Sequence, residues 1–444
     1  MKNKNKSKGK ESIDIVDSVV ILLNLASVRC LLPYIVLPFN KATWIMGFAI
    51  LVDIVYFVVF VKKMPLQRYL HIPAAIIFVV LLFYNFINTL IQGTASFVTG
   101  MEYIVLALLF LLIMASVASK ITLRHPDIKD VASGFSKGYV WLSMFSIIGV
   151  LVTFILLRAG LERSFPIDSP ILADNEEKGA SYVWTFFSTR MEVFDLTQIR
   201  VPFFQDYGIL TGLFHEPHVL AINIFPCLIL LLGLKSGKLS HGIIITLMML
   251  FVLFCGSTAN ILSLLLTLFV FLFLSSKKNL FKVMIGVVVI FFVVMAYVSY
   301  DDTLLQFVLG RLDVDNGSQE ASRNLLEFAF IPRTLFGTDM FSSSMMEGAQ
   351  KNEDVGFIPF FMNITFLFFY FKNVIKLILS KDNVAKATGY ASLYYIIHSA
   401  KNGMLMYRSL MPLFLVFLQF VVIDYYGRIR IAGKMLSPRE GTES

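Results

Sequence analysis

A seven-residue segment at 212–218, reading Gly-Leu-Phe-His-Glu-Pro-His, brings one carboxylate and two imidazoles to the edge of a strongly apolar stretch. Ionisable groups are costly inside a membrane, and where they occur there they usually serve a function. Glu216 can accept a proton or pair with an arginine, and His215 or His218 can exchange protons near neutral pH. These three residues are therefore candidates for acid–base chemistry.

Two other kinds of chemistry would use the same residues. A zinc protease needs two histidines four positions apart on one helix face, whereas His215 and His218 are three apart, so we predict no metal site. A proton-coupled transporter would use Glu216 in a relay, which the membrane acids Asp53 and Glu102 could join. However, Asp53 and Glu102 could each be a hydrogen-bonded structural acid instead. The transporter is therefore an alternative and not the main prediction.

The composition indicates where this segment lies. Of the 444 residues, 57% are hydrophobic and only 15% are charged, against about 25% in an ordinary soluble domain. A soluble globule of this length cannot hide so much apolar surface, which excludes a soluble enzyme and a disordered chain. The net charge of +8 is better explained by cations at the cytoplasmic ends of membrane helices than by nucleic-acid binding. The cysteines lie within apolar runs and form no disulfide or metal-ligand pattern: Cys30, Cys227 and Cys255.

Apolar runs of roughly bilayer-spanning length recur along the whole chain. They predict an all-α, polytopic integral membrane protein with about 12 transmembrane helices in a single membrane domain, 1–444. A lysine-rich N-terminus could precede a signal peptide, but no small-x-small cleavage site follows, so we expect an uncleaved first helix. The excess of lysine and arginine on one side, as in 62–70 and 120–137, places both termini in the cytoplasm. The expected spans are 13–37, 42–61, 72–92, 98–119, 138–158, 209–232, 241–255, 259–274, 280–300, 357–371, 385–400 and 404–426.

The apolar stretch 241–274 is too long for one membrane helix. A single helix would extend about 51 Å, whereas the bilayer core is about 30 Å thick. Lysines flank both ends, so both ends are expected on the cytoplasmic side. We predict a hairpin of two short helices, 241–255 and 259–274, that turns at 256–258. Polar side chains at this turn, including Asn260, could bind a ligand or satisfy the broken backbone.

Two long external loops are expected, at 159–208 and 301–356. Most cytoplasmic cations are lysine, whereas most external ones are arginine, whose planar fork binds phosphate or carboxylate oxygens with two hydrogen bonds. As a group the arginines predict an external anion site, although each one could instead pair with an acid of the same loops. The external arginines are Arg158, Arg163, Arg190, Arg200, Arg311, Arg323, Arg333 and Arg408.

The first loop also contains an aromatic-rich segment, 182–207, in which Tyr, Phe and Val lie among charges. This pattern suits a helix at the membrane surface or a lid over a lipid-facing cavity. Packing of the segment onto neighbouring spans is an equally good explanation. In the second loop, Ser322 could cap a short helix that carries Arg323 and Glu327 on one face and ends at Pro332.

Four segments, in order along the chain, resemble the O-antigen polymerase/ligase superfamily, the Wzy-type membrane polymerases. They are similar to its G-x-F-x-E-P segment, its broken hairpin, the R…L(F/L)G segment of its large external loop, and the segment that closes that loop. In this chain they read Gly212-Leu213-Phe214-His215-Glu216-Pro217-His218, Gly256-Ser257-Thr258, Ser322-Arg323 with Leu335-Phe336-Gly337, and Asp354-Val355-Gly356-Phe357.

Two features depart from the family pattern. Family members often carry an arginine close before the first glycine, whereas the nearest one here is Arg200. Ligase members carry a histidine in the large external loop, and 301–356 contains none. The missing histidine favours a polymerase over a ligase.

The resemblance implies an enzyme that transfers a glycan from undecaprenyl pyrophosphate to a hydroxyl of another lipid-linked repeat unit, at the outer face of the bacterial plasma (inner) membrane. It implies no cofactor, metal or nucleic acid. The partners would be the lipid-linked oligosaccharide, the bilayer, and chain-length regulator and flippase proteins. A ligase of the same superfamily and a lipid-linked oligosaccharide transporter or flippase are the alternatives. The catalytic candidates are Glu216, His215, His218 and Arg323, and the substrate-binding candidates are Arg200, Arg311, Arg333, Arg408 and Lys401.

Overall fold

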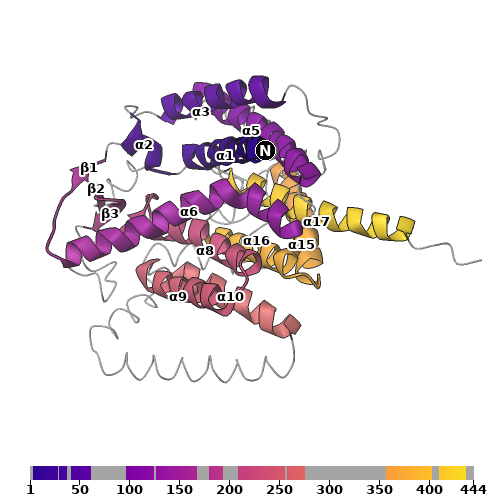
Figure 1. The fold of residues 1–444 in the computed structure, drawn as a ribbon. Coiled ribbons are helices and arrows are strands. Elements are labelled where there is room, and N and C mark those ends of the chain that lie inside the picture. Colours follow the sequence, from indigo (N-terminus) through magenta and orange to yellow (C-terminus); the bar gives the residue numbers. More distant parts are fainter. Residues whose placement is uncertain are drawn as a thin grey trace, which may run out of the picture.

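Helix α6 (Ile128–Arg158) is the longest of the described helices and runs through the middle of the bundle (Figure 1). On one side of it lie α1 (Lys4–Ser27), α3 (Ala42–Tyr56) and α5 (Phe97–Arg124). On the other side lie α8 (Pro217–Leu234), α9 (Lys238–Cys255) and α10 (Thr258–Ser275). The chain then adds α15 (Phe357–Ile378), α16 (Asn383–Asn402) and α17 (Met411–Leu436). The computed structural model describes residues 4–28, 30–37, 42–61, 97–124, 127–167, 180–193, 209–255, 258–275, 357–402 and 410–436.

The described helices have the length and surface of a membrane protein. Four are long and apolar enough to cross a bilayer: Thr43–Phe60, Met101–Ile121, Ile128–Arg158 and Pro217–Leu234. Shorter apolar helices occur at Ile15–Ser27, Lys238–Val252, Asn260–Leu274 and Met411–Tyr426. The outer surface of α9 and α10 is lined by exposed apolar side chains, which suit contact with lipid: Ile243, Ile245, Met249, Leu262, Leu265, Phe269 and Phe273.

The described part of the chain is therefore mostly helical, with four helices that could cross a membrane. The total of about 12 spans and the orientation of the termini stay predictions. The expected spans 72–92 and 280–300, and the whole of the expected loop 301–356, lie outside the described residues.

The prediction of a helical hairpin at 241–274 is confirmed. Helix α9 ends at Cys255, and α10 begins at Thr258. The sequence between the two helices is Gly-Ser, and both residue types favour a helix less than the leucines on either side. Helix α3 also follows its expected span and ends in one π-helical turn, η1 (Phe57–Val61).

Two expected spans begin or end differently in the structure. The span 13–37 is not one helix, because α1 ends at Ser27 and a separate short helix, α2 (Leu32–Val36), follows. Pro33 explains this break, since its ring and missing N–H do not allow a helix to continue through it. The span 209–232 begins instead as a strand, and its helix starts only at Pro217, where a proline is well tolerated.

The expectation of an all-α fold is wrong in the first loop and at the start of the expected span 209–232. Four strands form an antiparallel sheet in the order β1 (Phe165–Pro166), β2 (Ala180–Thr185), β3 (Ser188–Val193) and β4 (Ile209–Gly212). The described part of 182–207 is thus two strands joined by a turn, most of β2 and all of β3, rather than a surface helix. Its β-branched and aromatic residues favour a pleated surface, and Tyr182 pairs with Met191 across the sheet in a small buried cluster.

The β2–β3 turn docks on the middle helix. The Thr153 hydroxyl of α6 donates to the Thr185 carbonyl (3.1 Å) and accepts from the Phe187 N–H (3.2 Å). One turn earlier on the same helix face, Gly149 lets the Phe187 carbonyl approach the helix backbone. The turn also holds Phe186 at a φ of 52°, a left-handed conformation that a phenylalanine adopts only when its surroundings fix it. Helix α6 therefore positions the β2–β3 hairpin.

Replacing Gly149 by alanine is expected to loosen this docking. The new Cβ would fall inside the contact distance of the Phe187 carbonyl, a backbone atom that cannot rotate away. Overpacking of this kind costs about 1–3 kcal/mol, so the melting temperature of the purified protein should fall. Gly242→Ala is the matched control, because nothing lies within 4 Å of that position. Equal melting temperatures for the two variants would contradict the docking.

Candidate functional site

The first two residues of the segment 212–218 form hydrogen bonds to three other parts of the chain. The Gly212 N–H donates to the Ser188 hydroxyl of β3 (2.8 Å), and the Leu213 N–H donates to the Ser146 hydroxyl of α6 (3.1 Å). The Leu213 carbonyl accepts from the N–H of Leu31, just before α2 (2.8 Å). Gly212 has a φ of 62°, and a Cβ there would collide with Ser146, so the position requires glycine.

Glu216 and His218 form a partly exposed pair at the N-terminus of α8. The Glu216 carbonyl accepts the first helix bond, from the Leu220 N–H (2.9 Å). Its side chain makes no capping bond to the helix and instead lies 2.9 Å from His218, measured from Oε2 to Nε2. The two side chains are 25% and 26% exposed, respectively. The carboxylate is therefore within reach of a ligand and beside the positive end of a helix dipole.

The pair continues into the protein through buried polar groups. His398 of α16, which is fully buried, donates from Nε2 to the His218 carbonyl (3.1 Å). Its Nδ1 lies 3.4 Å from the hydroxyl of Tyr394, one helical turn earlier. That hydroxyl donates to Oδ1 of Asn260 at the start of α10 (2.6 Å). We call these five residues, Glu216, His218, His398, Tyr394 and Asn260, the polar line.

Helix α8 is fixed between α6 and α16, which brings the polar line together. On one face, the hydroxyls of Tyr139 and Ser143 of α6 both donate to the Asn223 carbonyl, near the interior Pro226 that interrupts helix bonding. On the other face, Gly233 lies so close to α16 that an added Cβ would meet Ala387 at 2.5 Å. The close approach of α8 and α16 is what allows His398 to reach the start of α8.

The structure brings together some of the sequence-predicted residues and leaves others undescribed. Glu216 and His218 form a contact pair. His215 is only 6% exposed, so a ligand reaches it less easily. Lys401 belongs to α16, but its side chain is not described. The remaining candidates lie outside the described residues: Arg200, Arg311, Arg323, Arg333 and Arg408.

The arginines predicted to be external have local partners where the structure describes them. Arg190 of β3 lies 3.3 Å from Glu192, so this arginine forms an ion pair with an acid of its own loop, as the alternative explanation predicted. Arg163 lies over the ring of Phe165, at 5.0 Å from its centre, a cation–π contact. Among the described residues, no group of three or more His, Cys, Asp or Glu could hold a metal ion.

Sequence reasoning missed Tyr394 and Ser146. A usable signal exists for Tyr394, because it lies four positions before His398 and residues at that spacing share a helix face. Ser146 gave no signal, since its partner Leu213 is 67 positions away in the sequence.

Tyr394→Phe is expected to destabilise the protein through the polar line. The substitution removes the donor to Asn260 and leaves a buried amide oxygen without it, at a cost of about 1–3 kcal/mol. Thermal unfolding in detergent measures the loss. Tyr390→Phe, one turn away and packed on Phe271, removes a hydroxyl for which no comparable buried bond is seen in the described region. A Tyr394→Phe protein as stable as the Tyr390→Phe protein would show that the Asn260 bond contributes little.

No protein-family model, curated protein or solved structure matches the chain. The resemblance of the sequence segments to the polymerase/ligase superfamily therefore stays a prediction.

Proposed function

We propose that the chain is a polysaccharide polymerase that transfers an undecaprenyl-pyrophosphate-linked glycan onto another lipid-linked repeat unit at the outer face of the plasma membrane. The product would be a capsule, an O-antigen or a similar surface polysaccharide. One observation supports this most directly: the Glu216–His218 pair is open to ligands and is connected through His398 to Asn260 of the α9–α10 hairpin. The polar line thus connects two segments that resemble the superfamily.

The transfer needs a base for the acceptor and a charge partner for the leaving group. The acceptor hydroxyl oxygen would attack the anomeric carbon while the bond from that carbon to the pyrophosphate oxygen breaks. The hydroxyl proton would pass to the Glu216 carboxylate, which His218 orients from 2.9 Å. Undecaprenyl pyrophosphate would leave with the bonding electrons, and arginine forks, Arg323 first among them, would stabilise its charge.

The length distribution of undecaprenyl-linked glycans in a strain without the protein tests the proposal. A polymerase null should accumulate single repeat units, and the wild-type gene should restore the ladder of longer chains. Arg323→Ala, present in the membrane at normal level, should not restore it. Accumulation of long lipid-linked chains in the null strain would instead identify a ligase.

A transporter for lipid-linked sugars is the second candidate, because charged side chains are buried between the N-terminal helices. Asp17 of α1, Asp53 of α3 and Lys120 of α5 are each at most 5% exposed. Intramembrane charges of this kind often mark transport paths. Movement of lipid-linked repeats across proteoliposomes, without any change in glycan length, would favour this function over polymerisation.

A further inference from the structure

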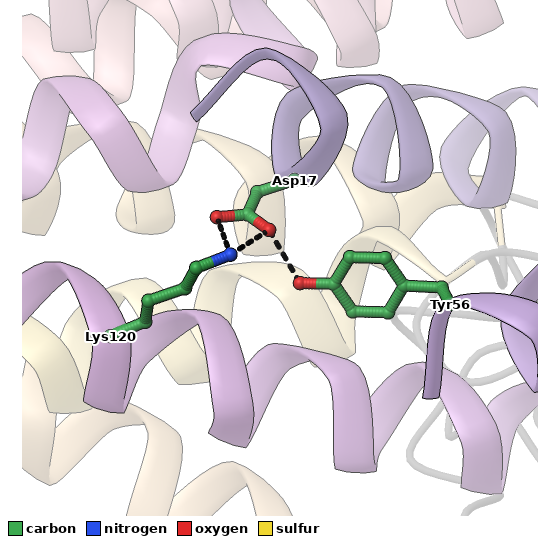
Figure 2. Close-up of polar contacts among 3 residues, drawn as sticks. All are labelled: Asp17, Tyr56 and Lys120. Atoms are coloured by element: carbon green, nitrogen blue, oxygen red, sulfur yellow. Dashed lines mark hydrogen bonds and ion pairs between the residues drawn. The ribbon is translucent and has the colours of Figure 1, made fainter. Parts of the chain in front are cut away.

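A complete ion pair lies between α1, α3 and α5. Figure 2 shows Lys120 Nζ pointing at both carboxylate oxygens of Asp17, at 2.6 and 2.7 Å, while the Tyr56 hydroxyl donates to the first of them at 2.5 Å. All three side chains are buried. Every oxygen of the Asp17 carboxylate has a partner, and the pair carries no net charge.

A second buried carboxyl group nearby is only half satisfied. Asp53, one helical turn before Tyr56 on α3, is fully buried, and so is Asn24, two turns after Asp17 on α1. The Asn24 amide donates to Asp53 Oδ1 (2.7 Å) and to the Val20 carbonyl (3.0 Å). Two atoms are left without a hydrogen-bond partner in the described part of the chain: Asp53 Oδ2 and Asn24 Oδ1.

The charges around Asp53 do not balance. The charged side chains described on the helices packed against α3 are Asp17 of α1 and Lys120 and Glu102 of α5, with Glu102 at the opposite end of α5 from Lys120. The titratable hydroxyl groups are those of Tyr56, on α3 itself, and of Tyr103 on α5, and the other hydroxyls on α1 and α5 belong to serines and threonines, which carry no charge. Lys120 is already held by both oxygens of Asp17. An ionised Asp53 would therefore be a buried charge without a counter-charge among the described residues, which is costly in a membrane.

We propose that Asp53 and Asn24 bind a monovalent cation, a proton or a sodium ion, between α1 and α3. When Asp53 is ionised, both unpartnered atoms are oxygens that can only accept, so the missing partner must be a donor or a positive ion. A proton would reside on Asp53 Oδ2 and could be donated to Asn24 Oδ1. A sodium ion would take the same two oxygens as ligands. This site does not depend on the proposed polymerase activity.

Thermal unfolding of the purified protein in nanodiscs tests the site and separates the two ions. Wild type, Asp53→Asn and the exposed control Asp130→Asn are each melted at pH 5 and pH 8, in sodium chloride or choline chloride. Amide replacement keeps the shape of Asp53 but cannot take up the proton or supply the charge. A folded-state proton is lost as pH rises, so the wild-type melting temperature should fall relative to Asp53→Asn, by about 2 °C or more.

A bound sodium ion gives a different pattern. The wild-type melting temperature at pH 8 should then rise when sodium replaces choline, while that of Asp53→Asn stays constant. Asp130→Asn should behave like wild type in either case. Identical responses of wild type and Asp53→Asn to both pH and sodium would overturn the proposal.

A second measurement decides the question if Asp53→Asn does not fold. Dicyclohexylcarbodiimide modifies protonated carboxyl groups in apolar surroundings, and mass spectrometry locates the adduct. Labelling of wild-type Asp53 that slows at higher pH, or in sodium, supports the site and identifies the ion. Absence of labelling at Asp53 at pH 5 without sodium would overturn it.

Discussion

Replacing Glu216 by glutamine is expected to slow glycan elongation by about 10²–10⁴-fold, the usual contribution of a general base. Glutamine keeps an oxygen that can accept from His218, so the local structure should persist, but it cannot take a proton from the acceptor hydroxyl. The side chain makes no capping bond to α8, so the helix should also begin normally. The measurement is the rate of chain growth on purified lipid-linked repeat units.

The control for Glu216→Gln is Glu162→Gln, an exposed carboxylate just after α6 that should have no effect on chain growth. Both proteins should melt at the wild-type temperature, so that slower growth reflects chemistry rather than unfolding. Elongation at the normal rate in a folded Glu216→Gln protein would remove Glu216 from the catalytic role. Slower growth in both variants would point to a general effect of charge near the loop.

The parts of the fold that the sequence predicts well are those with a local physical cause. The hairpin of α9 and α10 follows from an apolar stretch too long for one span with lysine at both ends. The importance of 212–218 follows from ionisable residues at the edge of an apolar run, and the structure does pair Glu216 with His218. The break between α1 and α2 is equally predictable, because Pro33 lies inside the expected span 13–37 and a proline disfavours a single helix.

The parts that could not be predicted depend on contacts between distant residues. The sheet in the first loop forms against α6, and the aromatic residues of β2 and β3 are as compatible with a membrane-surface helix as with a strand. His398 is 180 positions from the carbonyl it bonds, so only the packing of α16 on α8 brings it into the polar line. The sequence predicts that Lys120 belongs to the cytoplasmic segment 120–137. In the structure it is buried against Asp17, 103 positions away.

Lys120→Met is expected to be the most destabilising single substitution. Methionine has a similar volume but leaves the Asp17 carboxylate buried with the Tyr56 hydroxyl as its remaining partner among the contacts in Figure 2. Removing one member of a buried ion pair costs about 3–5 kcal/mol, because the other charge stays uncompensated. Unfolding in mixed micelles should show this loss as a lower midpoint. Lys129→Met, an exposed lysine of α6, is the control and should unfold like wild type.

A double variant separates loss of charge balance from loss of packing. Asp17→Asn combined with Lys120→Met removes both charges, and the asparagine can still accept from Tyr56, so most of the lost stability should return. The coupling energy from the cycle of single and double variants measures the pair itself. If the double variant is no more stable than Lys120→Met, the aliphatic stem of the lysine matters more than its charge. In that case an ionised Asp53 without its proposed cation would also be less costly than its burial indicates, since both carboxyls lie between α1 and α3.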